Sequence, residues 1–123
     1  MNIFVIDDSD VARKMLIRII SEDEDVRVVG EAGSGVGAIM ALRETQPDVV
    51  MLEADISGTM GAEEIIREIG EINPTISIIL CTDDSSNHMV IPLYELGIEQ
   101  FISKPYSKHK ILPVIGKVKQ QAV

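Results

Sequence analysis

The chain has no tryptophan, and two phenylalanines and two tyrosines bring its aromatic content to only 3%. Because 46% of its residues are nevertheless hydrophobic, the composition excludes a disordered chain and requires an aliphatic core. Cysteine is equally scarce, since Cys81 stands alone, which excludes an internal disulfide and favours a reducing compartment. Cys81 lies in the apolar stretch Ile76–Cys81, so we expect a buried, inert thiol.

Basic residues are also few, with 11 Lys and Arg against 20 Asp and Glu and a net charge of −9. This balance argues against direct binding of nucleic acid or of an anionic membrane, because both need clustered Lys and Arg. It suits a domain that holds a hard cation or docks on a basic partner, although solubility alone explains the charge equally well. The first apolar stretch is too short for a membrane span and lacks the basic residues of a signal peptide, so we expect a cytoplasmic protein.

Five short apolar runs alternate with segments of helical periodicity along the 123 residues, a length that fits one domain over residues 1–123. The runs are Ile3–Ile6, Val26–Val29, Val49–Leu52, Ile76–Leu80 and Gln100–Ser103. Most are nearly continuous in Val, Ile and Leu, which is typical of parallel strands buried on both faces. The last has the fewest apolar residues and would suit an edge strand. The alternation predicts an α/β fold with a doubly wound, five-stranded parallel sheet and five helices.

The clearest predicted helix follows the first strand, with Ser9 or Asp10 capping its start. Its apolar stripe consists of Ala12, Met15, Leu16, Ile19 and Ile20, while Arg13, Lys14 and Arg18 are expected to face away. Further helices are predicted over Gly37–Thr45, Ala62–Ile72, Asn87–Leu96 and His109–Lys119. Pro92 and Pro113 interrupt the last two, where we expect a late start or a kink.

Polar side chains are predicted to gather at one edge of this sheet, because they follow the carboxyl ends of its parallel strands. Ligands bind at this edge in such sheets. The strand ends supply Asp7, Asp8, Glu53, Asp55, Thr82, Asp83, Asp84 and Lys104. Clustered carboxylates repel one another unless a cation lies among them, and oxygen ligands select Mg²⁺ or a similar ion. A hydroxyl and a lysine opposite the metal suit a phosphoryl group. Singly, each residue has a plainer explanation, such as helix capping by Asp7 and Asp8, but together they favour a metal and phosphate pocket.

With these motifs in this order, the chain resembles the receiver domains of two-component response regulators, such as those of chemotaxis. The matching stretches are Phe4–Ser9, Val29–Ala32 with Gly35, Pro47–Leu52, Thr82 and Lys104–Pro105. The resemblance covers essentially the whole chain and implies a flavodoxin-like sheet with strand order 2-1-3-4-5. It also implies that Asp8 binds Mg²⁺ directly, that Asp7 helps through water, and that Asp55 lends its backbone carbonyl to the metal.

On the phosphoryl side of the pocket, the resemblance implies that Lys104 contacts phosphoryl oxygens and that the peptide before Pro105 is cis. Thr82 would move toward the phosphoryl group on activation, and Phe101 would be the aromatic switch residue. Residues 87–118 would form the output face that docks on a downstream protein or output domain. If the chain can be phosphorylated, the upstream partner would be a histidine kinase or a phosphotransfer protein.

The phosphoacceptor position departs from the family, because it holds Glu53 instead of aspartate. Glutamate places its carboxylate about 1.5 Å further out, and a misplacement of about 1 Å can cost on the order of 100-fold in rate. We therefore predict that Glu53 accepts phosphate poorly and acts as a phosphomimic, beside the metal and partly in the phosphoryl's place. An atypical natural receiver and an engineered phosphomimetic form both fit.

Other positions also depart from the family pattern. Asp83 stands where a small residue is usual, Ser57 where proline is usual and Met60 where aspartate is usual, and Pro92 breaks the output-face helix. These departures put ordinary phosphotransfer in doubt without affecting the fold.

Two other functions remain open. Asp55 would be an alternative phosphoacceptor, although the geometry of the strand end places it beyond the pocket.

A small Mg-dependent phosphatase would be an enzymatic alternative, because Asp8-Ser9-Asp10 resembles the start of haloacid-dehalogenase-type phosphatases. Helix capping explains Asp10 better, and 123 residues leave no room for the later motifs of such an enzyme. A flavin binder is disfavoured further, since the chain lacks tryptophan and a hydroxyl-rich loop after the first strand. We interpret the chain as a signalling receiver and not as an enzyme.

Overall fold

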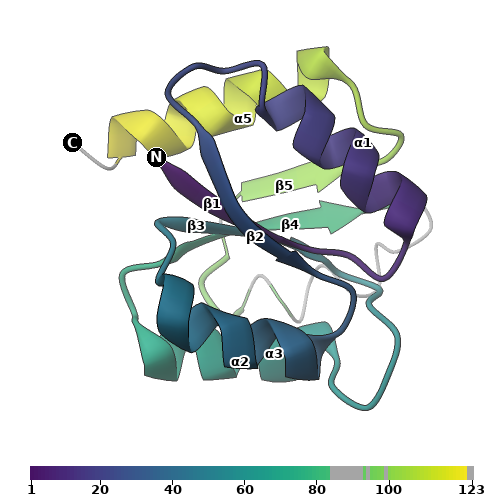
Figure 1. Ribbon diagram of the computed structural model, residues 1–123, viewed down its shortest axis with the longest axis vertical. Helices are drawn as coiled ribbons and strands as arrows, with labels where there is room; N and C mark the ends of the chain where they lie inside the picture. Colours follow the sequence, from purple (N-terminus) through teal and green to yellow (C-terminus); the bar gives the residue numbers. More distant parts are fainter. Residues whose placement is uncertain (84–92, 94, 99, 122–123) are drawn as a thin grey trace.

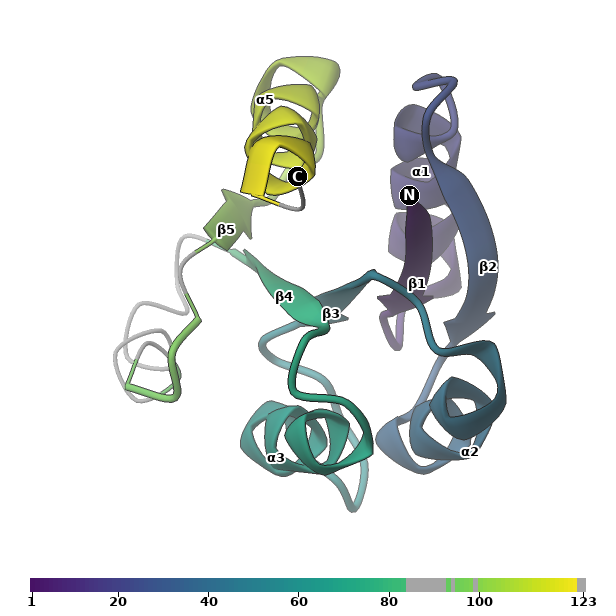
Figure 2. The ribbon, with the colours of Figure 1, turned by 90° about the vertical axis from the view of Figure 1, so that its left-hand side faces the viewer.

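The computed structural model describes residues 1–83, 93, 95–98 and 100–121. In this part of the chain, one parallel sheet has the strand order β2-β1-β3-β4-β5, as the resemblance implied (Figure 1). Its strands are β1 (Asn2–Ile6), β2 (Arg27–Ala32), β3 (Val49–Glu53), β4 (Ser77–Thr82) and β5 (Gln100–Ser103). Figure 2 shows α1 (Asp10–Ile20) and α5 (Lys108–Gln121) on one face of the sheet, and α2 (Gly35–Thr45) and α3 (Ala62–Ile72) on the other.

The sheet divides the hydrophobic core into two clusters, one on each face. Along β1, Ile3 and Val5 pack toward α1 and α5, whereas Phe4 and Ile6 pack toward α2 and α3. All four side chains are at most 1% exposed. Burial on both faces explains why the central strands are continuous apolar runs, as the sequence predicted.

The two edge strands differ from the central ones. β5 is an edge strand, as expected, and β2 forms the other edge. β2 extends three residues beyond the predicted end at Val29, because Gly30 and Glu31 break the apolar pattern but still pair with β1. A Cβ at position 30 would lie 2.6 Å from Cε2 of Phe4, so the closely packed aromatic ring explains the glycine.

The first helix confirms two expectations and corrects two. The Ser9 hydroxyl caps α1 by accepting from the amide of Ala12 at 3.2 Å. Leu16 and Ile20 are buried as predicted, but Met15 is 47% exposed, so its place in the inner stripe was wrong. Arg13 was expected to face solvent, yet its side chain is only 12% exposed. Both errors arise because periodicity indicates which face of a helix is apolar on average. It does not specify the contacts of residues at the edge of that face.

Two other helices begin earlier than predicted. α2 begins at Gly35, after the cap residue Ser34. α5 begins at Lys108 and continues through Pro113, so of the expected late start or kink the late start was wrong. Pro113 lies in the second turn of α5, where its missing amide leaves only one carbonyl without a helical partner.

The predicted helix over Asn87–Leu96, with Pro92, lies largely outside the described residues, as does the corresponding part of the output face at 87–118. The described part of the chain therefore contains four of the five predicted helices. None of the described helices combines the length and the apolar composition needed to cross a membrane.

Candidate functional site

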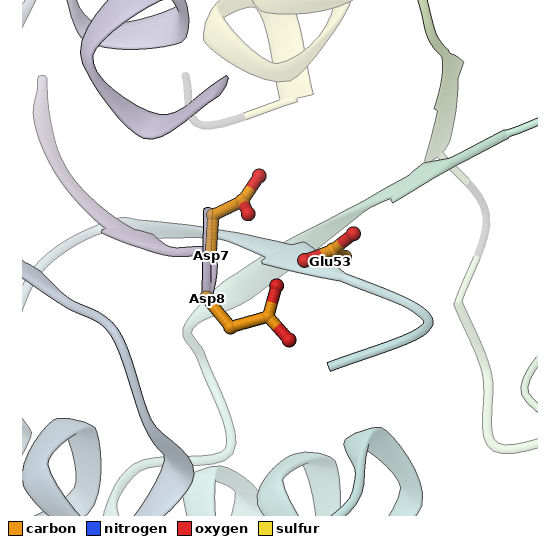
Figure 3. Close-up of side chains that lie close together, drawn as sticks. All are labelled: Asp7, Asp8 and Glu53. Carbon is orange, nitrogen blue, oxygen red and sulfur yellow. The ribbon is translucent and has the colours of Figure 1, made fainter. Parts of the chain in front are cut away.

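Three carboxylates meet at the carboxyl edge of the sheet, as the strand pattern predicted. Asp7 and Asp8 follow β1, and Glu53 is the last residue of β3. Figure 3 shows these side chains converging, and one oxygen from each lies within 4.8 Å of the others. The pairing of β1 with β3 brings the two strand ends together, because Ile6 lies opposite Leu52.

Asp7 is the buried member of the cluster, with 1% exposure. Its Oδ1 accepts from the amide of Ser9 at 2.9 Å. Its Oδ2 lies 3.7 Å from Nζ of Lys104 and accepts from the hydroxyl of Tyr106 at 3.4 Å. The lysine and the donors offset the cost of burying this carboxylate.

Asp8 is exposed, and Ser57 in the loop after β3 holds its carboxylate. The amide of Ser57 donates to Oδ2 of Asp8 at 2.8 Å. Hydrogen bonding by the Ser57 side chain and by Glu53 holds the pKa of Asp8 below its ordinary value. A proline at this position would have no amide hydrogen and would not make the amide contact. The departure at Ser57 therefore links Asp8 to the loop after β3.

Glu53 lies between this cluster and Lys104. Its Oε1 accepts from Nζ of Lys104 at 2.7 Å, and its side chain is only 12% exposed. Its Oε2 is buried and receives no hydrogen bond from the described residues. Burial raises the pKa of Glu53 to about 7, with Lys104 opposing the rise and Asp8 and Asp7 adding to it. Near neutral pH, Glu53 is therefore divided between a protonated form and a charged form paired with Lys104.

Lys104 remains a cation in this pocket. Burial lowers its pKa, but Glu53 and the charge of Asp7 outweigh burial and raise the pKa of Lys104 above its ordinary value. The ring of Tyr106 also lies 5.7 Å from Nζ of Lys104, within the range of a cation–π contact.

The cluster fits a hard divalent cation. It offers three carboxylates from two strand ends, and Oε2 of Glu53, to which no described residue donates, is an oxygen that a cation or a proton would satisfy. Such an ion would also offset the repulsion among the carboxylates. The side chain of Asp55 is exposed and is not a member of this cluster.

The remaining predicted site residues surround the pocket. Thr82 is the last residue of β4, is 8% exposed, and accepts from the amide of Lys104 through its backbone carbonyl at 2.6 Å. Phe101 is partly buried against the core cluster on the α2 and α3 face. Asp83 is exposed. The peptide between Lys104 and Pro105 is cis, as the resemblance implied. The roles of Thr82, Phe101 and Asp55 stay predictions.

Arg13 and Tyr106 contact this site, although the sequence pattern gave neither a role there. Arg13 donates to the backbone carbonyl of Asp7 at 2.6 Å. A signal for it was its position three residues after Asp10, with which it forms an ion pair. A signal for Tyr106 was its place directly after Lys104-Pro105.

Comparison with known proteins agrees with this geometry. Residues 3–115 match the response regulator receiver domain family. The chain is 31% identical over 116 residues to the chemotaxis protein CheY of Thermotoga maritima, covering 94% of this chain and 95% of that protein. It is 29% identical to protein CcdB of Bacillus subtilis over 94% of this chain and 95% of that protein.

Solved structures share the fold. The receiver domain of AraT, a response regulator from Geobacillus stearothermophilus, superposes with a TM-score of 0.91 at 20% identity, covering 98% of this chain and 94% of that one. The isolated receiver domain of RcsB from Salmonella enterica, in the presence of phosphomimetic BeF3⁻, gives a TM-score of 0.88 at 20% identity, with coverages of 98% and 88%. With its sheet order, its acidic cluster and its family match, the chain belongs to the response-regulator receiver domains of two-component signalling.

Proposed function

We propose that this receiver signals with Glu53 in the place of a phosphorylated aspartate, and not by ordinary transfer of phosphate to the end of β3. The observation that carries the proposal is the 2.7 Å contact between Nζ of Lys104 and Oε1 of Glu53. In the proposed role, the lysine binds an oxygen of the chain where it would otherwise bind an oxygen of a phosphoryl group. Glu53 thus acts as an internal phosphomimic.

The same contacts make Glu53 a poor nucleophile toward phosphate donors. Transfer needs a carboxylate oxygen that is charged, accessible and in line with the leaving group. Oε1 of Glu53 is held by Lys104, Oε2 is buried, and the carboxylates of Asp7 and Asp8 lie close to that of Glu53. Since the pKa of Glu53 is about 7, part of the population is also protonated at neutral pH.

Mg²⁺ is the proposed cation of the cluster. Asp8 and Glu53 would ligate it directly, Asp7 would help through water, and Asp55 would lend its backbone carbonyl. When bound, the cation would supply positive charge that offsets the carboxylates. The chain's own residues do the rest: Ser9 and Ser57 fix the two aspartates by hydrogen bonds, and Lys104 holds Glu53.

Communication would occur through a protein partner. A downstream protein or an output domain would dock on the 87–118 face, whereas the net charge of −9 disfavours direct contact with nucleic acid. A histidine kinase or phosphotransfer protein would be the upstream partner only if another carboxylate, such as Asp55, accepts phosphate. We place this signalling module in the cytoplasm and expect it to have no enzymatic turnover of its own.

A double-mutant cycle tests the contact that carries the proposal. Urea unfolding is measured at pH 8 for the chain, Lys104→Met, Glu53→Gln and the double variant. We expect a favourable coupling of about 1–3 kcal/mol, because the ion pair is partly buried and hydrogen-bonded.

The matched control for this cycle is the exposed pair of Lys108 and Glu22, whose Nζ and Oε1 are 2.8 Å apart. Its side chains are 60% and 44% exposed, so its coupling should stay below about 0.5 kcal/mol. A coupling for Lys104 and Glu53 no larger than this control would mean that the contact does not hold Glu53 in place, and the proposal would fail.

A further inference from the structure

We propose that Arg13 is a positioning residue of the metal pocket: its guanidinium fixes the peptide between Asp7 and Asp8 and so orients both carboxylates toward the cation. This inference rests on the proposed role of the cluster in binding Mg²⁺. Arg13 itself would not touch the ion. It would act on the backbone that carries the two aspartates.

Arg13 joins three segments around the end of β1. Its Nη1 donates to the backbone carbonyl of Asp7 at 2.6 Å, and its Nε donates to Oε1 of Glu31 at 2.8 Å. Its Nη2 donates to Oδ1 of Asp10 at 2.5 Å. Asp10 lies in the first turn of α1, and Glu31 lies in β2. The guanidinium therefore connects the start of α1 and the end of β2 to the backbone of Asp7, the first residue of the acidic pair.

The carbonyl that Arg13 binds belongs to the peptide linking Asp7 to Asp8. Rotation of this peptide would change the direction of both side chains, because it joins their two Cα atoms. The amide of Asp7 donates to the carbonyl of Ala32 at 3.1 Å, and Oδ1 of Asp7 accepts from the amide of Ser9 at 2.9 Å. Arg13 secures the carbonyl that these two bonds leave without a partner of their own.

The site around Arg13 is fitted to a guanidinium. The side chain is 12% exposed, and a Cβ at position 33 would lie 3.3 Å from Nη1, so Gly33 leaves just enough room. The three bonds use three different nitrogens of one planar group. A lysine ammonium is a single point of charge and would not span the same three acceptors.

The direction of the change in Mg²⁺ affinity distinguishes a positioning role of Arg13 from an effect of its charge alone. A positive group near a cation site repels the cation, so removing Arg13 would tighten Mg²⁺ binding if its charge were all that mattered. If Arg13 positions the aspartates, its removal weakens binding. Arg13→Lys is the sharper variant, because it keeps the charge and loses the planar fork.

The test is calorimetric titration of Mg²⁺ into the intact chain, Arg13→Lys, Arg13→Gln and the control Arg18→Gln. Calorimetry is chosen because the chain has no tryptophan whose fluorescence could report binding. Arg18 is exposed on the same helix. We expect both Arg13 variants to bind Mg²⁺ about 10-fold more weakly, as is usual when a group supporting metal ligands is lost. Arg18→Gln should bind as the intact chain does.

A second readout, without metal, is the carbonyl ¹³C resonance of Asp7, which should shift in both Arg13 variants and not in Arg18→Gln. If the remaining resonances keep their positions, this shift shows that the variants are folded and that the contact existed. Equal or tighter Mg²⁺ binding by Arg13→Lys, or an unchanged Asp7 resonance, would overturn the proposal for Arg13 while leaving the pocket's metal role intact. Absence of Mg²⁺ binding by the intact chain would overturn both.

Discussion

Replacing Glu53 with aspartate is expected to turn a chain that takes up almost no phosphate into one that does. Incubated with Mg²⁺ and acetyl phosphate, Glu53→Asp should gain the mass of one phosphoryl group, at least about 100-fold faster than the unchanged chain. In this step a carboxylate oxygen attacks phosphorus, the bond from phosphorus to the acetate oxygen breaks, and acetate leaves. Intact-mass spectrometry over time measures the rate directly.

The physical reason lies in the geometry of Lys104. Aspartate is one methylene shorter, so its carboxylate would withdraw from the 2.7 Å contact that Glu53 makes with Nζ of Lys104. The space and the lysine would then be available to the incoming phosphoryl group. Asp55→Asn in the Glu53→Asp background is the control and should leave the mass gain unchanged, since the Asp55 side chain is outside the carboxylate cluster. Equal phosphate uptake by the unchanged chain would rule out the phosphomimic.

The second large effect is a pH dependence of stability caused by Glu53. Burial raises the folded-state pKa of Glu53 to about 7 from an ordinary value of 4.5, so between these values the folded chain binds a proton that the unfolded chain releases. This contribution to stability is fully present below about pH 4.5 and is lost as the pH rises through about 7. At about 1.4 kcal/mol per unit of pKa, the loss approaches about 3 kcal/mol.

Glu53→Gln should abolish this loss, because an amide does not titrate. Urea unfolding at pH 5.5 and pH 8 in EDTA should detect about 2 kcal/mol of this loss, with both proteins compared at each pH. Asp8 works in the opposite direction, since its pKa is lowered, but that contribution changes only in more acidic solution. If the two proteins lose stability equally between pH 5.5 and 8, Glu53 is not the titrating group.

Much of the fold was predictable from the sequence because sheet position determines hydrophobic pattern. β1 and β3 are buried on both faces and appeared as continuous apolar runs. The carboxylate cluster was predictable for a related reason, since parallel strands bring their carboxyl ends to one edge. The sequence thus predicted that Asp7 and Asp8 would meet Glu53, although Asp8 and Glu53 are 45 residues apart along the chain. The three carboxylates do lie together in the structure.

Contacts that depend on individual geometry were not predictable. Periodicity placed Arg13 toward solvent and Met15 in the core, yet Arg13 binds the carbonyl of Asp7 and Met15 is 47% exposed. The hydrogen bond to Asp8 comes from the backbone amide of Ser57. Every residue except proline has such an amide, so the residue type at position 57 does not predict the bond. The raised pKa of Glu53 depends on burial, which only the folded structure determines.

The most direct test of the central claim compares the conformation of the unchanged chain with two reference states. The references are Glu53→Asp before and after phosphorylation, and the readout is the set of amide resonances of Thr82, Phe101 and Lys104, recorded with Mg²⁺. If Glu53 stands in for a phosphorylated aspartate, these resonances in the unchanged chain lie close to those of phosphorylated Glu53→Asp. Resonances that coincide with unphosphorylated Glu53→Asp would show that the contact between Glu53 and Lys104 does not reproduce the signalling state, and would contradict the account.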